Sequence, residues 1–124
     1  MPDLLGSGMA WLNQQRERWF SRMVSYRRGG LSLAVAATVG RTVFRLDVGP
    51  GVTERSEARD YLISAPLLAA LQAPQRGDQV IEEDATTRCI YEVMSPGREP
   101  VWRWTDADRR CYRIHTKLVK TETL

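Results

Sequence analysis

The sequence is poor in cysteine, lysine and histidine, and it has no long hydrophobic run. Two cysteines in 124 residues are too few for a disulfide scaffold or a four-cysteine zinc site. The longest apolar candidate, residues 31–39, contains Ser32 and Thr38 and is far shorter than the ~20 residues of a transmembrane helix. Because no basic region followed by an apolar stretch opens the chain, we expect no secretory signal peptide. These absences favour a soluble intracellular protein.

The length and composition favour one globular domain. A chain of 124 residues can bury an ordinary core but leaves no room for a second domain. A hydrophobic content of 43% is typical of folded proteins. We therefore expect a single domain over residues 1–124.

The basic residues are almost all arginine, and charge is unevenly distributed. Sixteen of the 18 basic residues are Arg, which suits phosphate or protein interfaces, although a GC-rich coding sequence would also explain this choice. Residues 1–30 and 98–124 each carry a formal charge of +3, whereas residues 31–97 carry −3. This distribution favours electrostatically distinct surfaces over a uniformly basic nucleic-acid binder.

The first twenty residues have the pattern of an amphipathic helix. Asp3 can cap a helix over residues 4–20, and apolar side chains recur at intervals of three and four residues. We expect residues 1–20 to form a helix that packs on a sheet or docks on another chain. Its apolar anchors would be Leu5, Met9, Leu12 and Trp19.

The next segment has the alternation of β-strands. Residues 22–28 and 31–39 flank Gly29-Gly30, a favoured hairpin turn. Gly40-Arg41 has the form of a type II′ turn, so we expect a third strand over residues 42–48.

Residues 49–59 break the alternation and predict a long polar loop. Gly49, Pro50 and Gly51 interrupt any strand, and the only large apolar residue before Tyr61 is Val52. Long structureless loops in compact domains are often functional or disordered. The polar and breaker residues that mark this loop are Gly49, Pro50, Gly51, Glu54, Arg55, Glu57 and Arg59.

The remainder predicts short strands separated by tight turns. One short helix, starting near Pro66, interrupts them. Because no βαβ alternation is visible, we expect a mainly β protein: a small antiparallel β-barrel over residues 21–119, with an N-terminal helix, a short internal helix and a long inter-strand loop.

Candidate reactive residues are few. The single histidine, His115, falls on the polar face of the last strand, and an ordinary exposed histidine is the favoured interpretation. Residues 82–84, Glu-Glu-Asp, alternate between faces of a strand and so predict a solvated strand end rather than a metal site. We expect no catalytic residue, metal or cofactor.

Trp102 and Trp104 lie two residues apart in a predicted strand, so both indoles share one face. Exposed, they would form a stacking platform for bases or a hot spot for a protein partner. Burial or a subunit interface is favoured over base stacking.

The order of these features resembles that of one protein family. A turn and strand, Pro-Gln-Arg-Gly-Asp-Gln-Val-Ile, occupies residues 74–81, and Tyr-Glu-Val follows at 91–93. Trp-Arg-Trp-Thr-Asp lies at 102–106, and Arg-Ile-His-Thr-Lys at 113–117. With the N-terminal helix and the polar loop, this order resembles the head–tail joining proteins of tailed bacteriophages, also called head-completion or stopper proteins.

The resemblance implies a non-enzymatic structural protein of the virion neck, present in the host cytoplasm during assembly. Such proteins form a small β-barrel that assembles as a homo-oligomeric ring between portal or adaptor and tail. They retain packaged double-stranded DNA without sequence specificity and provide the tail attachment surface. The loop over residues 49–59 would face the channel, although its mixed charge is no strongly basic DNA grip.

Two other functions remain open. One is a nucleic-acid-binding barrel that uses Trp102, Trp104 and arginines. The other is a small enzyme of unrecognised type around His115 and Asp106.

Overall fold

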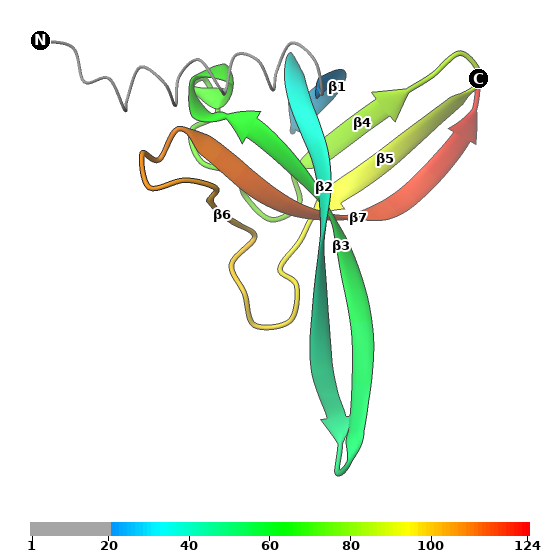
Figure 1. Cartoon of the computed structure of the whole chain (residues 1–124). Coiled ribbons are helices and arrows are strands. Elements are labelled where there is room, and N and C mark those ends of the chain that lie inside the picture. The colour runs from blue at the N-terminus through cyan, green and yellow to red at the C-terminus, as the bar shows by residue number, and fades with distance from the viewer. Residues whose placement is uncertain (1–20) are drawn as a thin grey trace, which may run out of the picture.

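The computed structural model describes residues 21–124, which form an antiparallel β-protein with one short 3₁₀ helix (Figure 1). The predicted N-terminal helix, with Leu5, Met9, Leu12 and Trp19, lies outside the described residues. The elements are β1 (Ser21–Arg28), β2 (Leu31–Gly49), β3 (Val52–Ser64), η1 (Ala65–Leu68), β4 (Gln79–Glu83), β5 (Thr87–Val93), β6 (Trp102–Trp104) and β7 (Cys111–Thr123). The predicted mainly β class and the short helix near Pro66 are confirmed.

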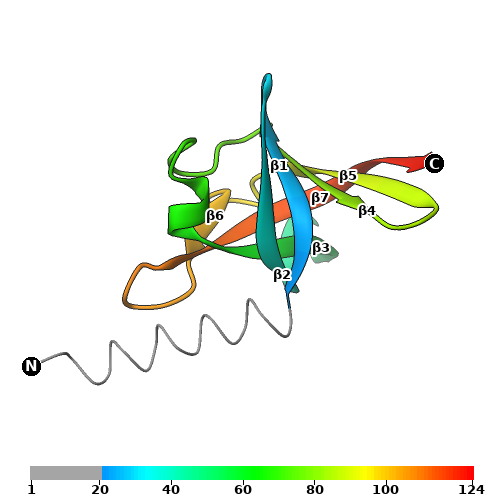
Figure 2. The ribbon, with the colours of Figure 1, turned by 90° about the horizontal axis from the view of Figure 1, so that it is seen from above.

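All the strand pairs are antiparallel, and the pairings form a closed circuit. The sheet has the order β3-β2-β1-β4-β5-β7-β6, and β3 also pairs with β7. Seen from above, β1 and β2 cross over β7 (Figure 2). Within residues 21–124 no helix has the length and hydropathy that crossing a membrane requires.

The core consists of residues that alternate along the paired strands. Tyr26, Val35 and Ile114 are buried, as are Tyr61 and Ile63 on β3. Leu68 extends this core from η1, which begins beside Pro66, a residue suited to the first turn of a helix. Burial on one face explains why the alternation in these segments predicts their strands correctly.

Asp78 is a buried anchor between β1 and the turn before β4. Its carboxylate accepts hydrogen bonds from Tyr26 Oη at 2.5 Å and from Arg28 Nε at 2.9 Å, and also from the backbone N–H of Gln75. Burial opposes ionisation, but the bonds from Arg28, Tyr26 and Gln75 outweigh it and lower the pKa of Asp78. Asp78, the last residue of the Arg-Gly-Asp run at residues 76–78, therefore has a structural role.

The predicted turn at Gly40-Arg41 is wrong, because β2 runs without a break from residue 31 to residue 49. A Cβ atom added at Gly40 would lie 3.4 Å from Arg113 Nη2 and 3.6 Å from Leu62 Cδ1. These are ordinary van der Waals distances to the ends of flexible side chains, so the strand does not depend on glycine at this position.

The predicted long loop over residues 49–59 is also wrong. The chain reverses at Pro50-Gly51, where Gly51 has a φ of +71°, and β3 starts at Val52. Residues 52–59 pair with β2 in register from Val52 to Arg59, with one irregularity near Gly49. Residues 52–59 form strand hydrogen bonds with β2 although their sequence lacks an apolar alternation. The alternation is missing because this part of the hairpin has no core to cover.

Candidate functional site

The most prominent feature of the molecule is a hairpin that projects from the body. Figure 1 shows the distal parts of β2 and β3 extending well beyond the other strands. We call residues 41–59 the arm. β1 pairs with β2 only as far as Thr38, and β7 pairs with β3 only from Arg59 onward. Beyond those points the arm strands pair, among the described residues, only with each other.

The register of the arm sorts its side chains onto two faces. Arg41 pairs with Arg59, Val43 with Glu57, and Arg45 with Arg55. Because paired residues in an antiparallel ladder point to the same side, these side chains share one face, which we call the arginine face. The alternate positions form the opposite face, where Thr42 pairs with Ala58 and Phe44 with Ser56, and where Glu54 follows on β3.

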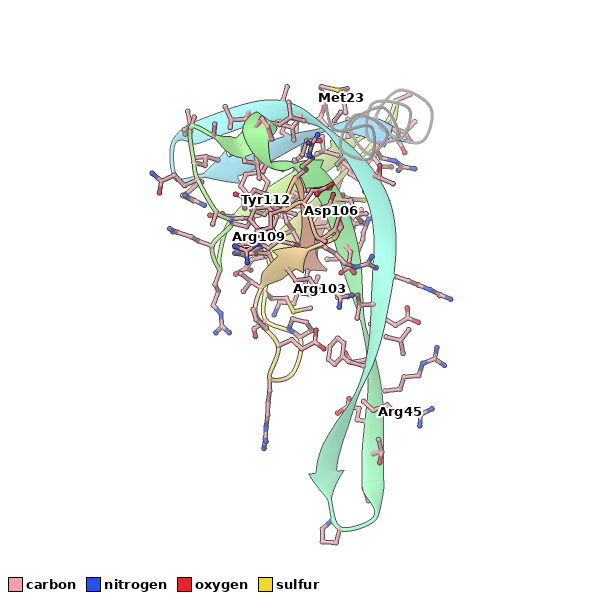
Figure 3. All side chains as sticks on the ribbon, turned by 60° about the vertical axis from the view of Figure 1, so that its left-hand side comes forward. Met23, Arg45, Arg103, Asp106, Arg109 and Tyr112 are labelled. Carbon is pink, nitrogen blue, oxygen red and sulfur yellow. The ribbon has the colours of Figure 1, made fainter. Side chains whose placement is uncertain are left out.

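The described ion pairs on the arginine face are long and exposed. Glu57 Oε1 lies 3.7 Å from a guanidinium nitrogen of Arg41 and 3.7 Å from one of Arg55. The side chains of Arg41 and Arg55 are 72% and 65% exposed, and that of Glu57 is 49% exposed. Exposed ion pairs of this length are screened by solvent, so both guanidinium groups remain available to an external anion. Arg45 is exposed as well (Figure 3).

A buried polar network lies at the base of the arm. Asp60 and His115 are both 0% exposed, and His115 Nδ1 lies 2.8 Å from Asp60 Oδ1. A carboxylate can only accept, so the histidine carries its proton on Nδ1. Arg113 Nε donates to Asp60 Oδ2 at 2.7 Å, and the Thr42 hydroxyl donates to the same oxygen. Arg113 Nη2 also donates to the Arg41 carbonyl at 2.9 Å, which links β7 to the start of the arm.

Hydrogen bonding keeps Asp60 ionised in this buried position. Burial on its own would raise the pKa of the carboxyl group. The hydrogen bonds from His115, Thr42 and Arg113 outweigh that effect and lower the pKa of Asp60. The network therefore holds an ionised carboxylate, paired with the Arg113 guanidinium, where the arm leaves the body.

The prediction of an exposed His115 is wrong. His115 does lie on the side of β7 opposite the core residues Tyr112 and Ile114, as the alternation indicates. The segment between β5 and β6 lies beside His115, since the His115 N–H donates to the Val101 carbonyl at 2.9 Å, and Glu99 Oε2 of that segment lies 3.8 Å from His115 Nε2. Alternation in one strand cannot reveal a covering segment from elsewhere in the chain.

Arg59 belongs to the body rather than to the exposed part of the arm. Its Nη2 donates to Glu82 Oε2 at 2.7 Å and its Nε donates to Tyr61 Oη at 3.0 Å. Its guanidinium carbon also lies 5.0 Å from the centre of the Tyr91 ring. These contacts leave Arg59 less available for an external anion than Arg41, Arg45 or Arg55.

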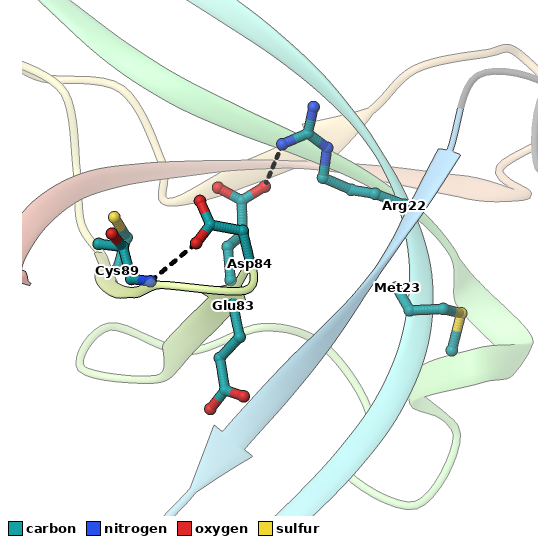
Figure 4. A pocket seen from close by; sticks show the side chains of 7 residues that line it. Arg22, Met23, Glu83, Asp84 and Cys89 are labelled. Carbon is teal, nitrogen blue, oxygen red and sulfur yellow. Dashed lines mark hydrogen bonds and ion pairs between the residues drawn. The ribbon is translucent and has the colours of Figure 1, made fainter. Parts of the chain in front are cut away.

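Glu82 and its neighbours border a hollow of about 440 Å³ beside the start of β1 (Figure 4). Arg22 Nη1 donates to Glu82 Oε1 at 3.2 Å, so this carboxylate bridges Arg22 and Arg59. Glu83 pairs with Arg88 at 2.6 Å, and Asp84 accepts from the Thr86 and Thr87 backbone N–H groups. In the described part of the chain no three His, Cys, Asp or Glu side chains are placed to hold a metal ion.

Trp102 and Trp104 share one face, as predicted, and both contact Tyr112. The Trp102 and Trp104 ring centres lie 4.9 Å apart in an edge-to-face arrangement. Trp104 stacks on Tyr112 at 4.8 Å with an interplanar angle of 19°. Both indoles are half-buried against the core. A subunit interface at their exposed parts stays a prediction.

The residues of the predicted channel loop all lie in the arm, which is a hairpin and not a loop. Glu54 lies on the face opposite Arg55 and Glu57, and Gly49, Pro50 and Gly51 form the tip. The sequence pattern does not single out Arg41 and Arg45, which it places in a turn and in an ordinary strand. Their separation by four residues, together with that of Arg55 and Arg59, was the available signal.

The described residues thus form a small antiparallel β-protein with a projecting, arginine-bearing hairpin. A family model described as phage head-tail joining protein matches residues 2–123, and the chain therefore belongs to that family. The predicted family is confirmed. Membership makes this a structural protein of the phage virion that acts between head and tail, at the neck. Comparison with curated proteins gives no match.

Proposed function

We propose that this chain assembles as a homo-oligomeric ring in the phage neck, between portal or adaptor and tail. The ring retains packaged DNA and provides the surface to which the tail attaches. The arm carries this proposal, because a hairpin that pairs with no other described strand is placed to reach beyond its own subunit. The closed circuit of strands behind it supports a small barrel as the ring-forming body.

In this proposal the arm, with Gly49, Pro50 and Gly51 at its tip, faces the channel. A ring requires two different surfaces on each subunit that close by rotation. The acidic middle and basic end of the chain support such complementarity, since residues 31–97 and 98–124 carry opposite net charge.

The N-terminal segment is proposed as the docking element. Its apolar anchors Leu5, Met9, Leu12 and Trp19 follow helical spacing and would seat in a groove of a neighbouring protein. Trp102 and Trp104, through their exposed parts, are proposed to contact an adjacent subunit.

A nucleic-acid-binding barrel that uses Trp102 and Trp104 receives less support. Trp104 already stacks on Tyr112, and Trp102 meets the same ring edge-on at 4.7 Å. A base-stacking platform requires free ring faces.

Removal of the arm tip tests the proposal. In the variant, residues 44–56 are replaced by Asn-Gly, which joins the cross-strand pair Val43 and Glu57 through a favoured two-residue turn. We expect phage heads to fill with DNA but to lose it, or to fail to join tails, as seen by electron microscopy and nuclease sensitivity. The matched control is Asp108→Asn, an exposed change away from the arm. Normal virions with the shortened arm would contradict the proposal.

A further inference from the structure

The arginine face of the arm offers a regular row of positive charge. On β2, Arg41 and Arg45 are four residues apart, which separates their Cα atoms by about 13 Å along the strand. Arg55 lies directly across the ladder from Arg45. Figure 3 shows the Arg45 side chain extending away from the arm ribbon.

Among the side chains that the structure describes on this face, the arginines outnumber the single carboxylate, Glu57. Glu57 is the acidic partner of both Arg41 and Arg55, at 3.7 Å from each. Arg45 forms no ion pair with any side chain that the structure describes. Guanidinium groups held apart and in solvent suit an external polyanion better than internal pairing.

The opposite face of the arm differs in chemistry. Thr42, Phe44, Ser56 and Ala58 are uncharged, and Ala58 is buried although it lies on the arm. Glu54 is the acidic residue of this face, near the tip. A single hairpin therefore presents arginines on one side, and on the other side partly covered, uncharged side chains near the body with Glu54 toward the tip.

We propose that the arginine face, through Arg41, Arg45 and Arg55, contacts the phosphates of the packaged DNA duplex, while the Phe44 face packs against protein. This inference rests on the proposed function, and it names which face of the arm meets the genome. Guanidinium groups bind phosphates in a bidentate manner without reading sequence. Each subunit contributes few such contacts, and Glu57 reduces their net charge. The binding is therefore weak per subunit, sensitive to salt, and increased by repetition around a ring.

Adjacent residues on opposite faces make a matched test. A photo-crosslinking benzoylphenylalanine is placed at Val43 in one variant and at Phe44 in another, and DNA-filled particles are irradiated. Val43 is 40% exposed between the arginines, whereas Phe44 is half-buried on the other face. We expect the probe at Val43 to crosslink DNA several-fold more than the probe at Phe44, which should crosslink protein. Equal or reversed DNA yields, protein crosslinks at Val43, or no crosslink at either position would overturn the inference.

Charge substitutions supply a second readout, namely the salt concentration at which filled heads lose half of their DNA. Arg45→Gln should lower this concentration, and Glu57→Gln should raise it, because it removes the counter-charge between Arg41 and Arg55. Arg76→Gln, the same charge change at an exposed arginine in the turn before β4, is the matched control and should leave it unchanged. Unchanged or parallel shifts in the two charge variants would overturn the inference.

The two proposals fail in distinguishable ways. Purified filled particles that lack this chain altogether would contradict the neck function itself. Particles that contain the chain but give no face-dependent DNA crosslink would contradict only the assignment of the arginine face.

Discussion

At the scale of single residues, Asp60 is the most constrained side chain near the arm. Its two oxygens accept from His115, Arg113 and Thr42, and it is fully buried. Asp60→Asn keeps the shape but leaves Arg113 without its carboxylate partner. Breaking a buried charge pair from one side costs about 3 kcal/mol of unfolding free energy. Urea denaturation of the purified chain measures this, with Glu57→Gln on the exposed arm as the control, for which a change below about 0.5 kcal/mol is expected. Equal stability of the two variants would contradict the role of the network.

The same carboxylates determine how stability responds to acid. Asp60 and Asp78 both have a pKa below the usual value of about 3.9, so the folded chain binds fewer protons than the unfolded chain at these groups. Their contribution to stability is complete above that value and is lost as the pH falls through it toward their folded pKa values. We expect the free energy of unfolding to drop steeply below pH ~4. In Asp60→Asn the drop should be shallower, and an unchanged slope would contradict the assignment.

Single residues also show where sequence reasoning stops. The alternation over residues 31–39 predicts that strand correctly, since Val35 and Ala37 on one of its faces are buried in the core. Gly40-Arg41 predicts a turn incorrectly, because β2 continues through it by pairing with β3, a tertiary contact with no local signal. Asp60, a charged residue beside a run of buried strand residues, was the sequence hint to a buried partner such as His115.

At the scale of elements, the arm was the segment least predictable from sequence. Strand prediction depends on a half-buried surface, and a hairpin that projects into solvent has no apolar alternation to detect. The breakers Gly49, Pro50 and Gly51 correctly marked a reversal of the chain, but residues 52–59 were assigned to the loop with them. Consequently the two faces of the arm, which depend on the register of β2 with β3, could not be derived from sequence.

The arm should be separable from the folding of the body. The ladder between Phe44 and Ser56 lies beyond the pairings that join β1 to β2 and β3 to β7. Replacing residues 44–56 by Asn-Gly should therefore leave a single cooperative thermal transition, since little core is removed. Circular dichroism at increasing temperature measures this transition in the variant and in the full chain. A broad or absent transition would show that the arm is required for folding.

The N-terminal segment should be separable as well. Among the described residues, the buried members of the core come from β1 to β5, β7 and the η1 region. A chain without residues 1–18 should fold, as judged by a cooperative urea transition, but should fail to join heads to tails in a complementation assay. The matched control is the full chain with Gln14→Ala and Gln15→Ala, outside the apolar stripe. Loss of folding on truncation would instead make this segment part of the core.

At the scale of the whole molecule, large exposed apolar side chains are scattered over the described residues. They come from β1, β2, β3, η1, β7 and the last residue of the chain. They are Met23, Leu31, Val43, Val52, Leu67, Leu118, Val119 and Leu124. Interfaces of permanent oligomers are large and strongly apolar, resembling a divided core. The formal charge of +3 per subunit adds mild repulsion between copies.

We therefore expect the purified chain to be monomeric, with ring formation requiring its neck partner. A partner that already presents binding sites in a circle raises the effective concentration of neighbouring subunits, so that weak contacts between copies suffice. Sedimentation velocity at micromolar concentration should give a species of about the chain mass of 14.1 kDa. Adding NaCl should leave the species unchanged, because repulsion is not what keeps the copies apart. A stable ring at these concentrations would mean that the surfaces between copies bind strongly on their own, and that the partner only positions the ring.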